Sequence, residues 1–177
     1  MSLDAKTTDS TLVTVISPPT STTLPKNFTV KKIALLVVIA TEALITAYVM
    51  ISLLRGVVEH GTAVKAAAIN WPIAGKTGTT DDFSDAWFIG FDPDLTLGVW
   101  VGYDQKKPLG SGMSGAEAAL PIWIDIFKTW IGDRKEPPKF EPPGNIVFVP
   151  IDKTTGDPLE GGFSEAFIAG TQPGSIR

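Results

Sequence analysis

Between Trp71 and Asp104 the chain alternates runs typical of β-strands with tight turns, and this pattern constrains the fold most strongly. The first run carries Lys76, the second extends from Ala86 to Phe91, and the third from Leu97 to Tyr103. Asp92-Pro93-Asp94 has the composition of a turn, because proline already has the φ that a turn requires. Connections this short join antiparallel strands, since parallel neighbours need a much longer crossover. The sequence therefore predicts a small antiparallel sheet.

An apolar segment, Ile33 to Leu54, precedes the sheet and has two interpretations. It is long enough to cross a bilayer, although Glu42 near its middle would cost about 2–3 kcal/mol there. Residues 33–40 are rich in β-branched side chains, as in a buried strand, whereas the residues after Thr41 place apolar side chains along one side, as in a core-facing helix. We expect a strand at 33–40 followed by a helix. A membrane span over the whole segment is the alternative.

The rest of the chain predicts a helix on the sheet and less regular ends. Beyond the sheet, apolar residues at helical spacing form a stripe suited to covering it: Ile122, Ile126, Phe127 and Trp130. The predicted fold class is α+β, an antiparallel sheet flanked by helices. We expect a loosely ordered lead over residues 1–40, a domain over 41–132, and a Pro/Gly-rich linker and tail over 133–177 with a short strand at 146–152.

The composition excludes several kinds of site. The chain has no cysteine and one histidine, which excludes disulfides, thiolate metal sites and multi-histidine metal clusters. Its net charge of −4 favours neither nucleic acid nor an anionic membrane surface as a partner. We therefore expect no metal, no cofactor and no nucleic-acid partner.

The first strand of the predicted sheet carries Gly75-Lys76-Thr77-Gly78-Thr79. A lysine among glycines and hydroxyls, with no acidic neighbour for four residues on either side, suits an anionic ligand. A phosphate loop would need glycine where Asn70 stands, and a helix where the strand-like Asp85–Phe91 follows. A nucleotide-binding protein that uses Gly75-Lys76-Thr77 is therefore the weaker alternative. The Lys-Thr-Gly element of the active-site-serine penicillin-interacting enzymes fits better.

Several blocks around this element resemble the transpeptidase domain of class A penicillin-binding proteins, which are bifunctional peptidoglycan synthases. The blocks follow in the same order as in that family: Tyr48 to Ala63, Ala74 to Thr80, Asp85 to Phe91, Gly98 to Asp104, Pro121 to Trp123 and Glu165 to Pro173. The resemblance covers roughly residues 41–175 and corresponds to the C-terminal part of the transpeptidase domain.

This resemblance implies part of the serine β-lactamase/penicillin-binding transpeptidase fold, and a role for four residues. In that family a serine attacks the D-Ala-D-Ala end of a stem peptide, or a β-lactam, and forms an acyl-enzyme. Lys76 would orient the substrate and assist proton movement. The hydroxyls of Thr77 and Thr79 would hold the terminal carboxylate, and the Thr79 N–H would be one of two oxyanion-hole donors. Gly78 would keep the face of the strand open to the ligand.

Two elements of a complete site are missing. Neither Ser-x-x-Lys nor Ser-x-Asn occurs in the sequence, and Thr23-Leu24-Pro25-Lys26 has threonine in place of serine and a helix-breaking proline. No glycan-polymerising domain is present either. We therefore expect that this chain alone neither cross-links peptides nor binds penicillin covalently.

The expected partners follow from this incompleteness. The missing N-terminal part of the transpeptidase domain would cover an apolar surface that otherwise favours self-association. The parent protein would work in the cell envelope, at the outer face of the cytoplasmic membrane, with its anchor outside this chain. A non-catalytic penicillin-binding-like interaction module is the alternative.

Overall fold

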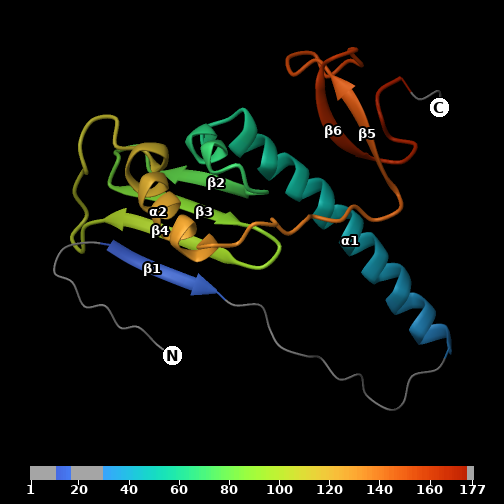
Figure 1. The fold of residues 1–177 in the computed structure, drawn as a ribbon, viewed down its shortest axis with the longest axis horizontal. Coiled ribbons are helices and arrows are strands. Elements are labelled where there is room, and N and C mark those ends of the chain that lie inside the picture. Colours follow the sequence, from blue (N-terminus) through green and yellow to red (C-terminus); the bar gives the residue numbers. More distant parts are fainter. Residues whose placement is uncertain (1–10, 17–29, 175–177) are drawn as a thin grey trace. The chain divides into compact units, whose positions relative to one another are not determined.

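The computed structural model describes residues 11–16 and 30–174 (Figure 1). Most of the expected lead, including Thr23–Lys26, lies outside the described residues. In chain order the elements are β1 (Thr11–Ile16), α1 (Val30–Glu59), the 3-10 helix η1 (Val64–Ile69), β2 (Ala74–Thr79), β3 (Asp85–Phe91), β4 (Thr96–Gly102), the π-helical turn η2 (Gly115–Ala119), α2 (Leu120–Ile131), β5 (Ile146–Ile151) and β6 (Phe163–Ile168). They divide into two compact units, residues 1–18 with 54–139, and residues 19–53 with 140–177.

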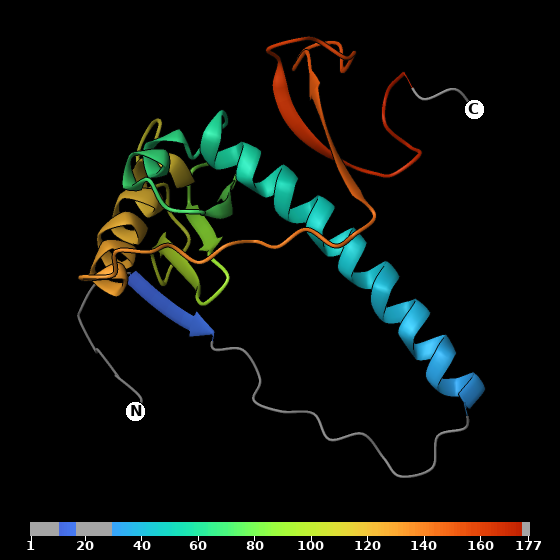
Figure 2. The ribbon, with the colours of Figure 1, turned by 45° about the vertical axis from the view of Figure 1, so that its right-hand side comes forward.

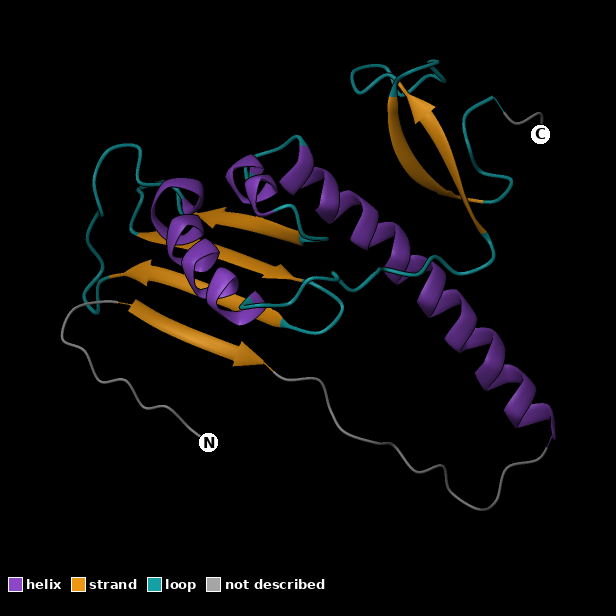
Figure 3. Cartoon of the chain, in the orientation of Figure 1, coloured by secondary structure: helices purple, strands orange, loops and turns teal. Residues whose placement is uncertain are grey.

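The first unit contains the predicted antiparallel sheet. Its strand order is β1-β4-β3-β2, and every neighbouring pair is antiparallel (Figure 3). The three strands expected between Trp71 and Asp104 are β2, β3 and β4, whereas β1 comes from the lead and was not predicted. The mixed α+β class with an antiparallel sheet is confirmed.

The core of the first unit lies where α2 covers one face of the sheet. Trp123 on α2 is fully buried, meets the ring of Phe88 edge-on at 5.0 Å, and stacks on Phe127 at 4.4 Å. Its indole N–H donates a hydrogen bond of 2.8 Å to the carbonyl of Leu97 on β4. A buried indole thus packs against two aromatic rings and also satisfies its one donor. Trp123 therefore fixes α2 against β3 and β4.

The strand expected at residues 33–40 is wrong, because these residues belong to the continuous helix α1. Strand propensity of β-branched residues is a weak preference, and no glycine or proline interrupts the chain between Val30 and Arg55. The helix expected to follow that strand therefore does not begin at Thr41. Its hydroxyl lies inside α1 and donates to the carbonyl of Val37 at 2.9 Å.

The length and composition of α1 agree with the alternative interpretation of this segment, a membrane span. Among the described residues, the helix from Lys32 to Glu59 is long and apolar enough to cross a membrane, and an 18-residue stretch of it has a mean hydropathy of 2.2. Only 11% of that stretch is buried. A helix that is apolar all round is unusual on a water-exposed surface.

The second unit contains a two-stranded antiparallel hairpin, β5 with β6 (Figure 2). β5 lies where the sequence predicts a short strand at 146–152, and β6 adds a partner in the segment expected to be a tail. Tyr48 of α1 meets Phe148 edge-on at 6.3 Å, and the hydroxyl of Ser52 donates to Glu165 at 2.8 Å. An aromatic contact and a hydrogen bond thus hold the hairpin to residues of α1.

Replacing Trp123 by alanine tests the core. We expect Trp123→Ala to lower the free energy of unfolding by about 3–5 kcal/mol, because it removes a large buried ring and leaves a cavity. Trp130→Ala is the matched control, since Trp130 lies on the same helix but is 37% exposed. Its cost should stay below about 1 kcal/mol. Urea unfolding followed by circular dichroism measures both, and equal losses would contradict this assignment of the core.

Candidate functional site

The strand predicted to carry Lys76 is β2, and it forms one edge of the four-stranded sheet. Among the described strands β2 pairs only with β3. A turn follows β2 and leads directly into β3, so the helix that a phosphate loop requires after its lysine does not form here. An edge strand leaves one row of backbone donors and acceptors free to meet an extended ligand.

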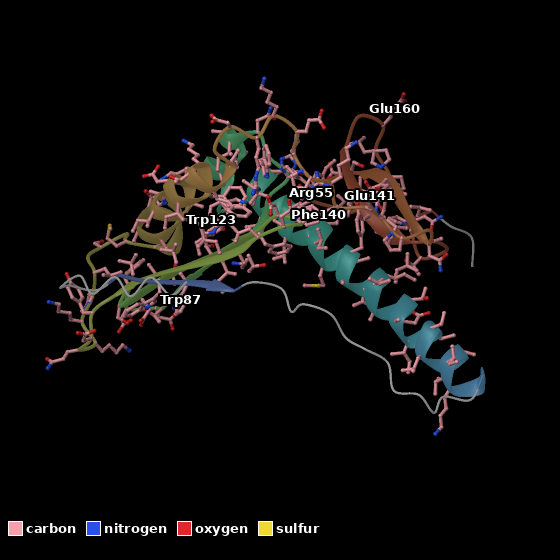
Figure 4. The ribbon with its side chains drawn as sticks, turned by 60° about the horizontal axis from the view of Figure 1, so that its bottom comes forward. Arg55, Trp87, Trp123, Phe140, Glu141 and Glu160 are labelled. Atoms are coloured by element: carbon pink, nitrogen blue, oxygen red, sulfur yellow. The ribbon has the colours of Figure 1, made fainter. Side chains whose placement is uncertain are left out.

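The pairing of β2 with β3 decides which way each predicted site residue faces. Thr77 lies opposite Phe88 and Thr79 opposite Ala86, two fully buried residues on the helix-covered face. Lys76 lies opposite Ile89 and Gly78 opposite Trp87 on the other face, where Ile89 and Trp87 are exposed. Figure 4 labels Trp123 on the helical side of the sheet and Trp87 on the opposite side. Side chains alternate along a strand, so the cation and the two hydroxyls share an edge but not a face.

The Lys76 side chain is exposed and bends onto the backbone of the next residue in its own strand. Its ammonium donates a hydrogen bond of 2.9 Å to the carbonyl oxygen of Thr77. A hollow of about 300 Å³ in the same unit is lined by other residues, namely Arg55, Val58, Glu59, Ala67, Asn70, Trp71, Pro72 and Ile73. None of the four predicted site residues lines this hollow.

Both threonine hydroxyls of β2 are held by residues distant in the sequence. Thr77 Oγ lies 2.8 Å from Thr62 Oγ, in the turn after α1. Thr79 Oγ accepts a hydrogen bond of 2.9 Å from the backbone N–H of Gly115, the first residue of η2. An ion pair of 2.7 Å between Lys65 and Glu117 joins η1 to η2. We call Thr62, Gly115 and this ion pair the β2 frame.

Sequence reasoning missed the β2 frame. Thr62 and Gly115 lie 15 and 36 residues from their hydroxyl partners, so no local pattern pairs them. The one sequence signal was the composition of the two segments, Gly61-Thr62 and Ser114-Gly115, which place a small residue and a hydroxyl at the ends of helical elements.

Comparison with known proteins finds relatives of this chain. The chain is 50% identical over 129 residues to penicillin-binding protein 1A of Aquifex aeolicus, and 45% identical over 112 residues to penicillin-binding protein 1A of Pseudomonas aeruginosa. These matches cover 71% and 63% of this chain. This chain is homologous to part of penicillin-binding protein 1A. No family model matches the sequence.

The structural comparison agrees with the homology to penicillin-binding protein 1A. The crystal structure of penicillin-binding protein 1A from Haemophilus influenzae matches with a TM-score of 0.62 and 38% identity, over 72% of this chain. The match covers only 20% of that chain, and the Aquifex and Pseudomonas matches cover 18% and 14% of those proteins. The matched part of this chain thus spans at most 20% of the length of these penicillin-binding proteins.

The turn after β2 in this penicillin-binding protein homologue is a dense polar network. Thr80 Oγ accepts hydrogen bonds from the backbone N–H groups of Ser84 and Asp85. Ser84 is buried and donates to the Asp85 carboxylate, which also accepts a bond of 2.9 Å from the Trp100 indole. The network fixes the connection from β2 to β3 and so stabilises their register.

One carboxylate of this turn has a shifted pKa. The Lys106 ammonium lies 3.1 Å from Asp82, and this contact is the largest cause that holds the pKa of Asp82 well below its usual range. Hydrogen bonds from Ser84 and Thr80 act in the same direction.

Gly115→Ala tests the close contact between η2 and β2. A Cβ at position 115 would lie 2.6 Å from the carbonyl oxygen of Gly78 and would also meet that of Trp87. Because neither backbone atom can turn aside, we expect the unfolding free energy to fall by about 1–3 kcal/mol. Gly144→Ala is the control, since an added Cβ there meets nothing within 4 Å. Chemical denaturation measures the free energy of unfolding of both variants. An unchanged value for Gly115→Ala would contradict the contact.

Asp82→Asn tests the link between this turn and pH. A carboxyl whose folded pKa is depressed contributes stability that is present above its unfolded pKa, near 4, and is lost as the pH falls through the folded value. The difference in stability between the parent chain and Asp82→Asn should therefore be largest near pH 7 and shrink steadily below about pH 4. Asp81→Asn removes the same charge one residue away and serves as the control. Thermal unfolding across pH measures both, and a pH-independent difference would contradict the prediction.

Proposed function

We propose that this chain is the C-terminal part of a peptidoglycan D,D-transpeptidase domain and supplies the Lys-Thr-Gly strand of its site. We call residues 76–79 of this strand the wall. The observation that carries the proposal is the edge strand β2, which presents Lys76, Thr77 and Thr79 in a chain homologous to penicillin-binding protein 1A. An edge strand can pair with an extended stem peptide through its backbone, while side chains at the same edge recognise the end of that peptide.

Each residue of the wall has a proposed role. The hydroxyls of Thr77 and Thr79 bind the carboxylate of the D-Ala-D-Ala end, or that of a β-lactam, by charge-assisted hydrogen bonds. The Thr79 N–H stabilises the oxyanion, a role in which losing one donor typically costs about 3–4 kcal/mol of barrier. Lys76 orients the substrate and assists proton movement, and Gly78 leaves room for the ligand because it adds no side chain to the strand.

The nucleophile comes from a segment that this sequence lacks. A serine there attacks the amide carbonyl carbon between the two D-alanines, the C–N bond breaks, and the terminal D-alanine leaves with a proton on its nitrogen. The amine of a second stem peptide then displaces the serine from the acyl-enzyme and forms the cross-link. With neither Ser-x-x-Lys nor Ser-x-Asn in its sequence, this chain is inactive alone.

The face of the sheet that carries Lys76 is the proposed contact for the missing N-terminal part of the domain. Trp87 and Ile89 on this face are 43% and 49% exposed, although both are large apolar residues. Relatives several times longer than this chain have ample sequence to cover them. Without that segment the face favours self-association.

The complete protein acts in the cell envelope, at the outer face of the cytoplasmic membrane, where its substrate lies.

Labelling with fluorescent penicillin tests the proposal. We expect no covalent label on this chain alone. We expect label on a chimera in which the matching 129 residues of this chain replace their counterparts in the Aquifex aeolicus protein. Lys76→Ala in the chimera should slow acylation by about 100-fold or more, because it removes a group that assists proton transfer. Lys107→Ala, which removes an exposed lysine over the Tyr103 ring, is the control.

Two outcomes would count against the proposal. A chimera that stays unlabelled, while the unaltered Aquifex protein is labelled, would favour a non-catalytic interaction module. A Lys76→Ala chimera that is acylated at the original rate would remove Lys76 from the site.

A further inference from the structure

Thr62 lies at the edge of the proposed site and has no role in the resemblance described above. It follows Gly61, where an added Cβ would come within 2.9 Å of the Val57 backbone. The N–H groups of Gly61 and Ala63 both donate to the carbonyl of Val57 at 3.1 Å, and Ala63 is fully buried. The backbone on both sides of Thr62 is therefore fixed by the end of α1, and the Thr62 side chain starts from a rigid position.

The Thr62 hydroxyl contacts only one of the two wall hydroxyls. Its oxygen lies 2.8 Å from Thr77 Oγ, the usual distance for an O–H···O hydrogen bond. Each hydroxyl carries one proton. One of the two protons forms the hydrogen bond between the hydroxyls, and the other can be donated to another acceptor. The direction of the shared bond therefore decides which of the two hydroxyls can donate to a ligand.

The contact at Thr79, the other threonine of the strand, has a fixed direction and gives a parallel. Thr79 Oγ accepts from the N–H of Gly115, a group that can only donate. The proton of the Thr79 hydroxyl therefore stays free for an acceptor outside the fold. If Thr62 donates to Thr77 in the same way, both wall hydroxyls accept from the scaffold and donate toward the ligand.

We propose that Thr62 is a positioning residue of the carboxylate site: its hydroxyl donates to Thr77 and so directs the Thr77 proton toward the carboxylate of the stem peptide or β-lactam. The proposal rests on the proposed function. A hydroxyl that accepts a hydrogen bond also donates a stronger one. The two successive hydrogen bonds, from Thr62 to Thr77 and from Thr77 to an anion, therefore strengthen each other. Thr62 itself is exposed and lies on a different element from the wall it serves.

The test uses the full-length chimera with two ligands, benzylpenicillin and its methyl ester, in which the carboxylate is masked. Stopped-flow acylation separates the dissociation constant of the initial complex from the acylation rate constant. We expect Thr62→Val to weaken the initial binding of benzylpenicillin by about 3- to 10-fold, the effect of one neutral hydrogen bond. The same substitution should leave binding of the ester nearly unchanged. Thr62→Ser, which keeps the hydroxyl, should restore the original binding of benzylpenicillin.

Two further variants separate positioning from folding. Thr129→Val is the matched control, because Thr129 donates to the Asp125 carbonyl on α2 and lies outside the site. In a Thr77→Val background, Thr62→Val should have no further effect on benzylpenicillin, because the hydroxyl that it positions is gone. If Thr62→Val lowers the yield of folded protein, Thr62→Ser and the Thr77→Val background still give the comparison.

Each result supports or overturns one of the two proposals. Equal weakening of acid and ester by Thr62→Val, or no weakening of either, overturns the role of Thr62. A further loss on adding Thr62→Val to Thr77→Val also overturns it. Failure of the proposed function appears earlier and separately, as a chimera with Thr62 intact that benzylpenicillin does not acylate.

Discussion

The antiparallel register between β2 and β3 is the constraint on which the rest of the proposed site depends. Pairing Lys76 with Ile89 puts Thr77 opposite Phe88, and strand alternation then sends the lysine and the threonines to opposite faces. A shift by one residue would exchange these faces and bring the lysine into the core. The buried side chains of β3 thus determine where the polar groups of β2 point.

The helical side of the sheet holds that register in place. Trp123 joins α2 to both β3 and β4 through ring contacts and a hydrogen bond, and Gly115 at the start of η2 reaches the Thr79 hydroxyl. The same layer that buries the core therefore also orients a wall hydroxyl. On the other face, Trp87 and Ile89 remain exposed, consistent with a chain that is homologous to only a part of penicillin-binding protein 1A.

Local pattern predicted much of the sheet but failed in the segment before it. The strands around Lys76, Phe88 and Val99 follow from apolar runs bounded by turn residues, a signal contained in a few neighbours. Residues 33–40 have an equally strong local preference for a strand, yet they continue α1. Helix formation is cooperative, so a segment without glycine or proline can extend a neighbouring helix against the preference of its residues. β6 was missed because its pairing with β5 spans a long loop.

The sequence by itself determined that a short strand carries Lys76, Thr77, Gly78 and Thr79 within an antiparallel sheet, since turn chemistry and apolar runs are local properties. It also determined that Ser-x-x-Lys and Ser-x-Asn are absent. Only the tertiary structure decided which faces these residues occupy and which groups hold their hydroxyls. Thr62 and Gly115 reach β2 through the packing of α1 and η2, and contacts between residues far apart in the chain leave no periodic trace in the sequence.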